Sequence, residues 1–142
     1  MNHKEHEEHK DQLERYAPLP TSTERVVREV IGAGLSVHRA LGPGFLETVY
    51  EQAIALELTL RDLSFQMQKP VAIHYRGHCI CSHRLDMVVE DAVVVEVKAV
   101  RSIKRIHQAQ VLSYLKASGC RVGLLMNFNV RLFVSGLQRF VR

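Results

Sequence analysis

The sequence of 142 residues has no tryptophan, few aromatic side chains and only three cysteines. An odd, small number of cysteines does not make the disulfide framework of a small secreted domain. No apolar run approaches the roughly 20 residues that a membrane helix needs. Residues 1–11 are polar and rich in His and Glu, unlike a signal peptide. We therefore expect a cytoplasmic protein without a membrane partner.

Acidic residues are missing from the last third of the chain. Residues 97–142 contain no Asp or Glu and nine Lys or Arg, whereas the whole chain has a formal net charge of only +4. A basic segment without acids favours a polyanionic partner such as nucleic acid. The alternative interpretation of the charge alone is a solvated basic surface.

The length and composition predict one globular domain after a short tail. Hydrophobic residues make up 46% and charged residues 24% of the chain, which is typical of a single packed core. Pro18 and Pro20 prevent a helix from running straight into the domain. We expect residues 1–20 to form a flexible polar tail and residues 21–142 to form the domain.

Hydrophobic periodicity predicts three helices. The first covers residues 21–41 and begins with a capping-box pattern, Thr21 with Glu24. The second covers residues 46–61. Its apolar face includes Leu46, Val49, Tyr50, Ala53, Leu56 and Leu60, and Ile54 widens this face. The third covers residues 103–117, and Val111, Leu112 and Leu115 are expected to face inward.

Alternating segments predict strands at residues 71–75, 78–83, 85–90, 92–97, 122–127 and 131–134, and a short last element at 137–141. The order α-α-β-β-β-β-α-β-β predicts an α/β domain with a mixed β-sheet flanked by helices.

Three charged residues interrupt strongly apolar strands: Asp86, Glu96 and Lys98. Burying an unpaired charge there costs several kcal/mol, so a compensating partner is needed. Two carboxylates suit Mg²⁺ or Mn²⁺. Glu96 and Lys98 are two apart on a strand and point the same way, so the ammonium would lie beside the attacking water. The plain alternative is an ion pair at a sheet edge.

The loop between residues 85–90 and 92–97 decides whether the carboxylates meet. A three-residue loop pairs Val89 with Val93 and places Asp86 opposite Glu96. A two-residue loop turns Asp86 to the other face of the sheet. The metal hypothesis therefore requires a loop with an odd number of residues, or a β-bulge.

Cys79, Cys81 and His83 share one face of a strand, but a structural zinc site needs four ligands, and the only other cysteine is Cys120. A plain β-hairpin is the favoured interpretation.

Several motifs resemble a known family in their residues, order and spacing. They are VHRALGPG at 37–44, GFLETVY at 44–50, RLD at 84–86, EVKAV at 96–100, HQAQVLSYLK at 107–116 and GLLMNFN at 123–129. Together they resemble the GxxExxY family of the PD-(D/E)XK nuclease-like superfamily, with Leu85 at the position of the proline in the superfamily name. The resemblance covers essentially everything after residue 20.

The resemblance implies a restriction-endonuclease-like αβββαβ core. It implies Asp86 and Glu96 as metal ligands and Lys98 as the catalytic lysine. Glu47 matches an additional acidic residue near the metal, and Gln110 matches a frequent active-site glutamine.

The sequence thus predicts a Mg²⁺- or Mn²⁺-dependent phosphodiesterase that acts on nucleic acid, with DNA ahead of RNA. Arg101, Lys104 and Arg105 are expected to contact the phosphate backbone. A protein partner is expected to supply specificity to so small a domain, and a homodimer is a separate expectation. The rival interpretation is a non-catalytic nucleic-acid-binding or protein-interaction module on the same fold.

Overall fold

A computed structural model describes residues 18–142. The tail expected at residues 1–20 lies outside the described residues, except for its last three. The helices are α2 (Thr21–Leu41), α3 (Glu47–Leu60), α4 (Arg105–Ser118) and the single turn α5 (Phe133–Gly136), and the strands are β1 (Phe65–Tyr75), β2 (His78–Val89), β3 (Val93–Lys98), β4 (Val122–Asn127) and β5 (Leu137–Val141). None of the helices in this part of the chain is long and apolar enough to cross a membrane.

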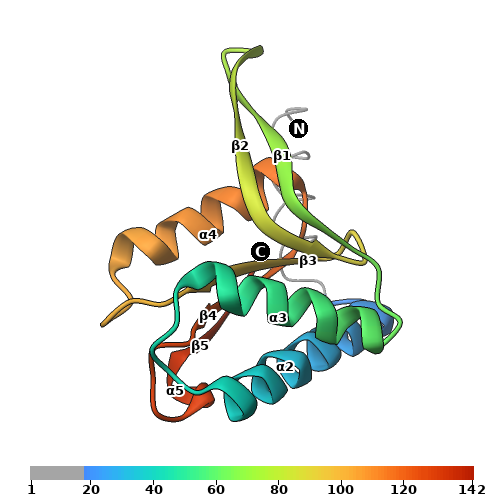
Figure 1. The fold of residues 1–142 in the computed structure, drawn as a ribbon. Coiled ribbons are helices and arrows are strands. Elements are labelled where there is room, and N and C mark those ends of the chain that lie inside the picture. The colour runs from blue at the N-terminus through green and yellow to red at the C-terminus, as the bar shows by residue number, and fades with distance from the viewer. Residues whose placement is uncertain (1–17) are drawn as a thin grey trace.

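The five strands form one mixed sheet in the order β1-β2-β3-β4-β5. β3 and β4 are parallel, with α4 as the crossover between them, and the other neighbours are antiparallel. This is the α/β architecture that the sequence predicted. The long β1–β2 hairpin projects well beyond the body of the domain, as Figure 1 shows.

Helices cover both faces of the sheet and create two apolar clusters (Figure 1). In β3, Val93, Val95 and Val97 pack against α2 and α3, whereas Val94 packs in the smaller cluster with Leu115 of α4. Because β3 is covered on both faces, an alternating polar pattern is absent from its sequence. A charged residue in this strand is therefore exceptional.

Several local predictions were wrong. The first strand, predicted at residues 71–75, begins at Phe65. Residues 78–83 and 85–90 belong to one continuous strand, β2, because Arg84 pairs with Pro70 without interruption. Residues 131–134 do not form a strand, since the turn α5 begins at Phe133. At the first helix Pro20, not Thr21, occupies the N-cap position, and its carbonyl accepts the hydrogen bond from the Glu24 N–H.

The second helix buries only part of the predicted apolar face. Tyr50, Ile54 and Leu58 are fully buried at successive turns, while Leu46 is 77% and Leu60 70% exposed. In the third helix, Leu112 is exposed and not inward-facing. Apolar residues on two sides of a helix leave the buried face ambiguous until the neighbouring elements are known.

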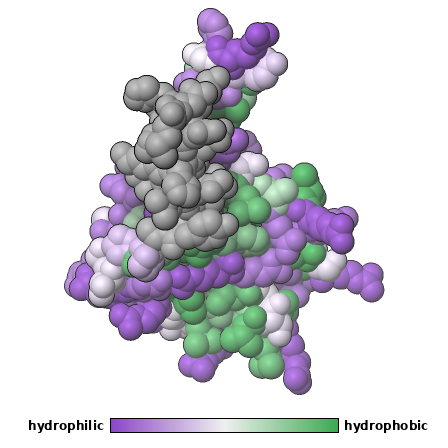
Figure 2. Space-filling model, turned by 180° about the vertical axis from the view of Figure 1, so that it is seen from behind, coloured by the Kyte–Doolittle hydropathy of each residue, from purple (hydrophilic) through white to green (hydrophobic). Residues whose placement is uncertain are grey.

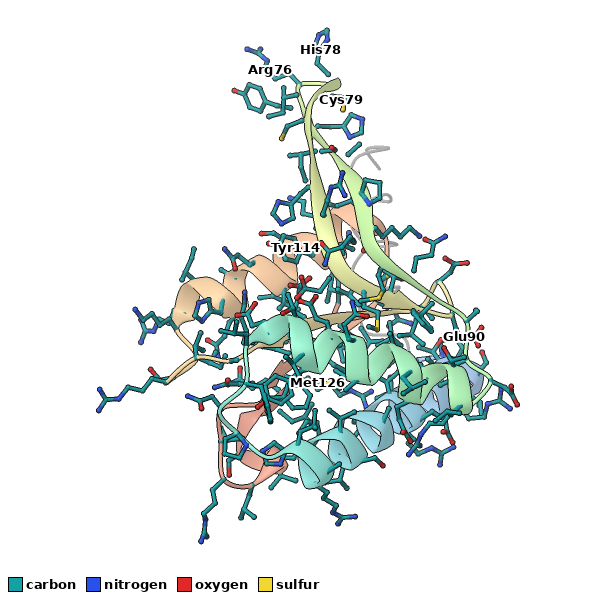
Figure 3. All side chains as sticks on the ribbon, in the orientation of Figure 1. Arg76, His78, Cys79, Glu90, Tyr114 and Met126 are labelled. Carbon is teal, nitrogen blue, oxygen red and sulfur yellow. The ribbon has the colours of Figure 1, made fainter. Side chains whose placement is uncertain are left out.

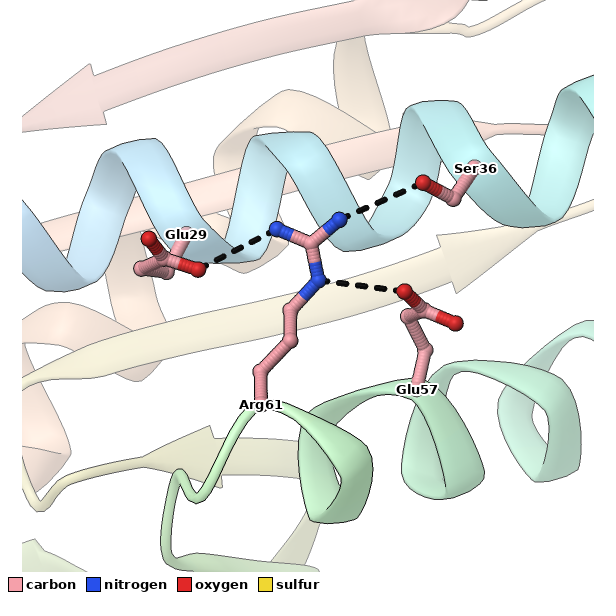
Figure 4. A network of polar contacts seen from close by, with 4 residues as sticks. All are labelled: Glu29, Ser36, Glu57 and Arg61. Atoms are coloured by element: carbon pink, nitrogen blue, oxygen red, sulfur yellow. Dashed lines mark hydrogen bonds and ion pairs between the residues drawn. The ribbon is translucent and has the colours of Figure 1, made fainter.

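Arg61, just after α3, fastens this helix to α2 (Figure 4). Its guanidinium contacts Glu57 at 3.1 Å, Glu29 at 3.1 Å and Ser36 at 3.2 Å. It lies over Gly32, where a Cβ atom would come within 2.7 Å of Nη1. The ion pairs are partly exposed and are worth roughly 0–1 kcal/mol each, so their main effect is on the relative placement of the two helices.

Candidate active site

The β2–β3 hairpin has the strand register that the metal hypothesis requires. Val89 pairs with Val93 and Met87 with Val95, so a three-residue loop joins the strands, as the first of the two alternatives predicted. Continued by one step, this register sets Asp86 opposite Glu96 on the same face of the sheet. Beyond Met87 and Val95 the two strands diverge, and β2 turns upward into the projecting hairpin (Figure 1).

Hydrogen bonds from the main chain orient both carboxylates where the ladder ends. The Asp86 N–H donates to Oε1 of Glu96 at 3.2 Å. The Val97 N–H donates to Oδ2 of Asp86 at 2.9 Å. The acidic side chains thus take the place of the backbone carbonyls that a continuing ladder would supply.

A break in β1 accompanies the divergence. Gln68, which the register of β1 and β2 would set opposite Asp86, has φ 51° and makes no ladder pair, whereas Met67 and Lys69 on either side are paired. A positive φ is uncommon for a residue other than glycine and bends the strand. The irregularity lies directly beside the candidate ligand Asp86.

The electrostatics of the pair match a site built for a cation. Glu96 is only 5% exposed. Its burial, together with the nearby charge of Asp86, raises the pKa of Glu96 to about 9. Glu96 consequently holds a proton at neutral pH unless a positive charge replaces it. The Lys98 ammonium favours the ionised form of Glu96, though less strongly.

Helix α3 contributes a carboxylate that the sequence reasoning missed. Glu51 lies one turn after Glu47 and is buried, and the pKa of Glu51 is raised by burial and by the charges of Asp86 and Glu47. Lys98 acts on it in the opposite direction. Five ionisable groups, Asp86, Glu96, Lys98, Glu47 and Glu51, therefore lie close to one another. The i, i+4 spacing of Glu47 and Glu51 was the available signal.

The buried Tyr50 fixes the loop in front of Glu47. Its hydroxyl donates to the Gly42 carbonyl at 2.7 Å and accepts from the Phe45 N–H at 3.1 Å. Its ring stacks on Phe128 at 4.5 Å. Gly44 has φ 113°, a conformation that other residues rarely adopt. The Gly-x-x-Glu-x-x-Tyr spacing thus joins a glycine turn, an acid at the site and a tyrosine that holds the turn.

Helix α4 forms the wall opposite α3. Burial and the charges of Glu96 and Asp86 raise the pKa of Tyr114, and its ring stacks on His83 of β2 at 4.7 Å. Figure 3 shows Tyr114 where α4 meets the base of the hairpin. Gln110 lies one turn earlier and is half-buried. In the described part of the chain, its amide makes no hydrogen bond to Lys98 or to either carboxylate.

Asn127 holds the chain that leaves β3. This buried residue accepts from the Val100 N–H at 3.0 Å and donates to the Val100 carbonyl at 2.9 Å. In the parallel register it stands beside Lys98. The clamp fixes the direction of the chain after Lys98.

The three predicted phosphate contacts lie on the exposed segment after this clamp. Arg101, Lys104 and Arg105 are exposed, at or just before the start of α4. His107 caps that helix, because its Nδ1 accepts a hydrogen bond from the Lys104 N–H at 3.0 Å. The three positive charges therefore lie on the segment that leads from the end of β3 to the first residue of α4.

The residues present fit a hard divalent cation. Mg²⁺ commonly uses one or two carboxylates and keeps several waters, and Asp86 and Glu96 are two adjacent carboxylates with one retained proton to displace. Among residues 18–142 no group of three or more His, Cys, Asp or Glu side chains is already gathered tightly enough to hold an ion. That finding also leaves Cys79, Cys81 and His83 without a zinc site in the described chain.

The domain is thus a mixed sheet flanked by helices, with Asp86 and Glu96 side by side where β2 and β3 diverge. A family model of the PD-(D/E)XK nuclease superfamily matches residues 24–140. The chain belongs to this superfamily. No curated protein and no solved structure gives a significant match.

Proposed function

We propose that this protein is a metal-dependent nuclease that hydrolyses phosphodiester bonds, with DNA ahead of RNA as its substrate. The observation that carries the proposal is the main-chain-oriented pair of Asp86 and Glu96, with Lys98 beside it. Membership of the superfamily supports hydrolase chemistry. The Gly44–Glu47–Tyr50 arrangement supports placement in the GxxExxY family.

Asp86 and Glu96 would hold Mg²⁺ or Mn²⁺, and Glu47 would add a further acidic group. When bound, such a cation acts as a Lewis acid on phosphate and lowers the pKa of water. Glu51 extends this set, because it is buried next to the same charges.

Lys98 would orient the attacking water and stabilise negative charge that develops on the phosphate. Gln110 would position Lys98 or the phosphate from α4. Arg101, Lys104 and Arg105 would contact the backbone of the nucleic acid, which brings affinity but no sequence specificity. A protein partner or a second copy of the chain would supply that specificity, and the cytoplasmic location remains a prediction.

The test is a cleavage screen on single-stranded, duplex and branched DNA and RNA with Mg²⁺, Mn²⁺ and Ca²⁺. We expect product with Mg²⁺ or Mn²⁺ and little with Ca²⁺, whose looser coordination positions water less strictly. Asp86→Asn should remove the activity, whereas Asp62→Asn, on an exposed turn, should retain it. Binding without cleavage on every substrate would favour the non-catalytic binding module.

A further inference from the structure

The outer end of the β1–β2 hairpin projects beyond the body of the domain (Figure 1). Residues 78–84 of β2 are exposed without interruption, so both faces of the strand meet solvent. Tyr75 is 65% and Ile80 61% exposed. Only the inner end of this ribbon contacts the domain, where His83 stacks on Tyr114 of α4 and residues 72–74 face the same helix, and its outer end covers no core. We call residues 72–84 the arm.

The arm and its base lack negative charge. Residues 63–85 contain no Asp or Glu, but they contain Lys69, Arg76, Arg84 and three histidines. Figure 2 shows hydrophilic side chains at the end of the arm, and Figure 3 shows Arg76 and His78 at its tip. A protruding ribbon of one charge sign is complementary to a polyanion.

The size of the arm selects the kind of nucleic acid. From Arg84 to His78 the strand spans about 20 Å at roughly 3.3 Å per residue. The major groove of B-form DNA, about 12 Å wide and 8.5 Å deep, admits a two-stranded ribbon. The major groove of duplex RNA is deep and too narrow for protein side chains to read.

The arm also leads directly to the candidate site. Arg84 is two residues from Asp86, and His83 stacks on Tyr114 beside the carboxylates. A groove of about 400 Å³ runs between the arm and α4, with His74 on one side and Lys116 on the other. Like the arm, α4 has no acidic residue.

We propose that the arm enters the major groove of duplex DNA, with one phosphate backbone in the groove between the arm and α4. This rests on the proposed function and narrows its substrate to duplex DNA. Lys116 and Arg76 contact phosphates on either side of the ribbon, and the duplex is held across Asp86 and Glu96.

The test compares the full chain with a variant in which residues 73–81 are replaced by Asn-Gly, which favours a tight hairpin turn. Fluorescence anisotropy in Ca²⁺ follows binding to a 30-base-pair DNA duplex, its single strand and the matching RNA duplex. We expect the shortened arm to weaken DNA-duplex binding by about tenfold or more, because the variant loses the phosphate contact of Arg76 together with the contacts of the ribbon in the major groove. Single-strand binding should stay within about twofold of the full chain.

Point variants keep the test decisive if the shortened chain does not fold. Arg76→Ala should reduce the slope of log affinity against log salt by about 0.9 on duplex DNA. Arg25→Ala, an exposed arginine on α2, is the charge-matched control and should leave the affinity unchanged. Unchanged duplex binding in Arg76→Ala and in a folded shortened variant would overturn the proposal, and so would an equal loss on single strands.

The two proposals fail separately. If the full chain cleaves DNA but the arm variants bind and cleave duplexes normally, only the arm assignment is wrong. If the arm variants lose duplex binding and the full chain never cleaves, the arm stands and the nuclease proposal falls.

Discussion

The Asp86 main-chain N–H donates to the buried carboxylate of Glu96 at 3.2 Å, so one proposed ligand is oriented by the backbone of the other. The arrangement brings two acids together, one of which, Glu96, is buried. The free energy of unfolding of the protein therefore depends on pH and on bound cations, and both dependences can be measured.

Removing the buried acid should stabilise the metal-free protein at pH 8. The pKa of Glu96 is raised to about 9 in the folded protein from 4.5. Between these values the folded state keeps a proton that the unfolded state has released, so stability falls as pH rises. Glu96→Gln should raise the free energy of unfolding at pH 8 by about 1–4 kcal/mol, and this gain should shrink at pH 5. Urea denaturation in EDTA measures both, with Asp62→Asn as the control. A wild-type stability that is flat from pH 5 to 8 would contradict the raised pKa.

Cation binding should release protons. The cation needs ionised ligands, whereas burial and Asp86 keep Glu96 protonated at neutral pH. Mg²⁺ affinity should therefore increase between pH 6.5 and 8.5. Calorimetry in two buffers with different ionisation enthalpies gives the number of protons released. Glu51→Gln should weaken Mg²⁺ binding more than Asp62→Asn does. Affinity independent of pH would contradict the combination of a raised pKa and a ligand role for Glu96.

Lys98→Ala should separate cleavage from cation binding. The carboxylates remain in this variant, so Mg²⁺ affinity should change little, while the rate of cleavage should fall by about 100-fold or more, as expected for a group that stabilises developing charge. Product formation and calorimetry on the same samples make the comparison. Activity that persists in both Lys98→Ala and Asp86→Asn would place the chemistry elsewhere.

The exposed basic segment before α4 should account for much of the salt dependence. Replacing Arg101, Lys104 and Arg105 together with alanine should weaken binding to all nucleic-acid sequences alike. The slope of log affinity against log salt should become shallower by up to about 2.7 on duplex DNA, roughly 0.9 for each phosphate that the variant no longer neutralises. Affinity that does not respond to salt in the wild type would point to a protein partner.

Tyr50→Phe should loosen the turn in front of Glu47. The change removes the hydrogen bonds with the Gly42 carbonyl and the Phe45 N–H but leaves the ring on Phe128. We expect a loss of about 1–2 kcal/mol in stability, since partners are left unsatisfied. Thermal denaturation measures the loss, and a cleavage assay below the unfolding transition shows its effect on Glu47. A fully stable, fully active variant would mean that the stacked ring alone holds the turn.

Much of the site follows from local rules. The charges of Asp86, Glu96 and Lys98 stand out because the surrounding strands are apolar, and strand alternation with a three-residue loop brings the two acids together. Residues that join segments distant in sequence are harder to predict. The clamp of Asn127 on Val100 depends on the parallel pairing of β3 with β4, which no local pattern specifies.

The errors have a common physical origin. In α3, leucines occupy both sides of the helix, and tertiary packing selects Tyr50, Ile54 and Leu58 for the core. Tertiary packing also explains why Glu51 was missed, because its burial and its proximity to Asp86 depend on how α3 packs against the strands. At β2 the sequence suggested two strands, because the exposed and mostly polar residues 78–84 are followed by an apolar, buried segment that begins at Leu85. The change in burial resembles a change of strand.

Gly136 shows how a position outside the site can govern it. A Cβ atom there would overlap the main-chain carbonyl oxygen of Asn127, and the backbone has no flexible side-chain end that could move aside. Any substitution would displace the end of β4, and with it the amide that fixes Val100 after Lys98. A screen for inactive variants should therefore recover position 136, and an alanine there should be as damaging as a larger residue.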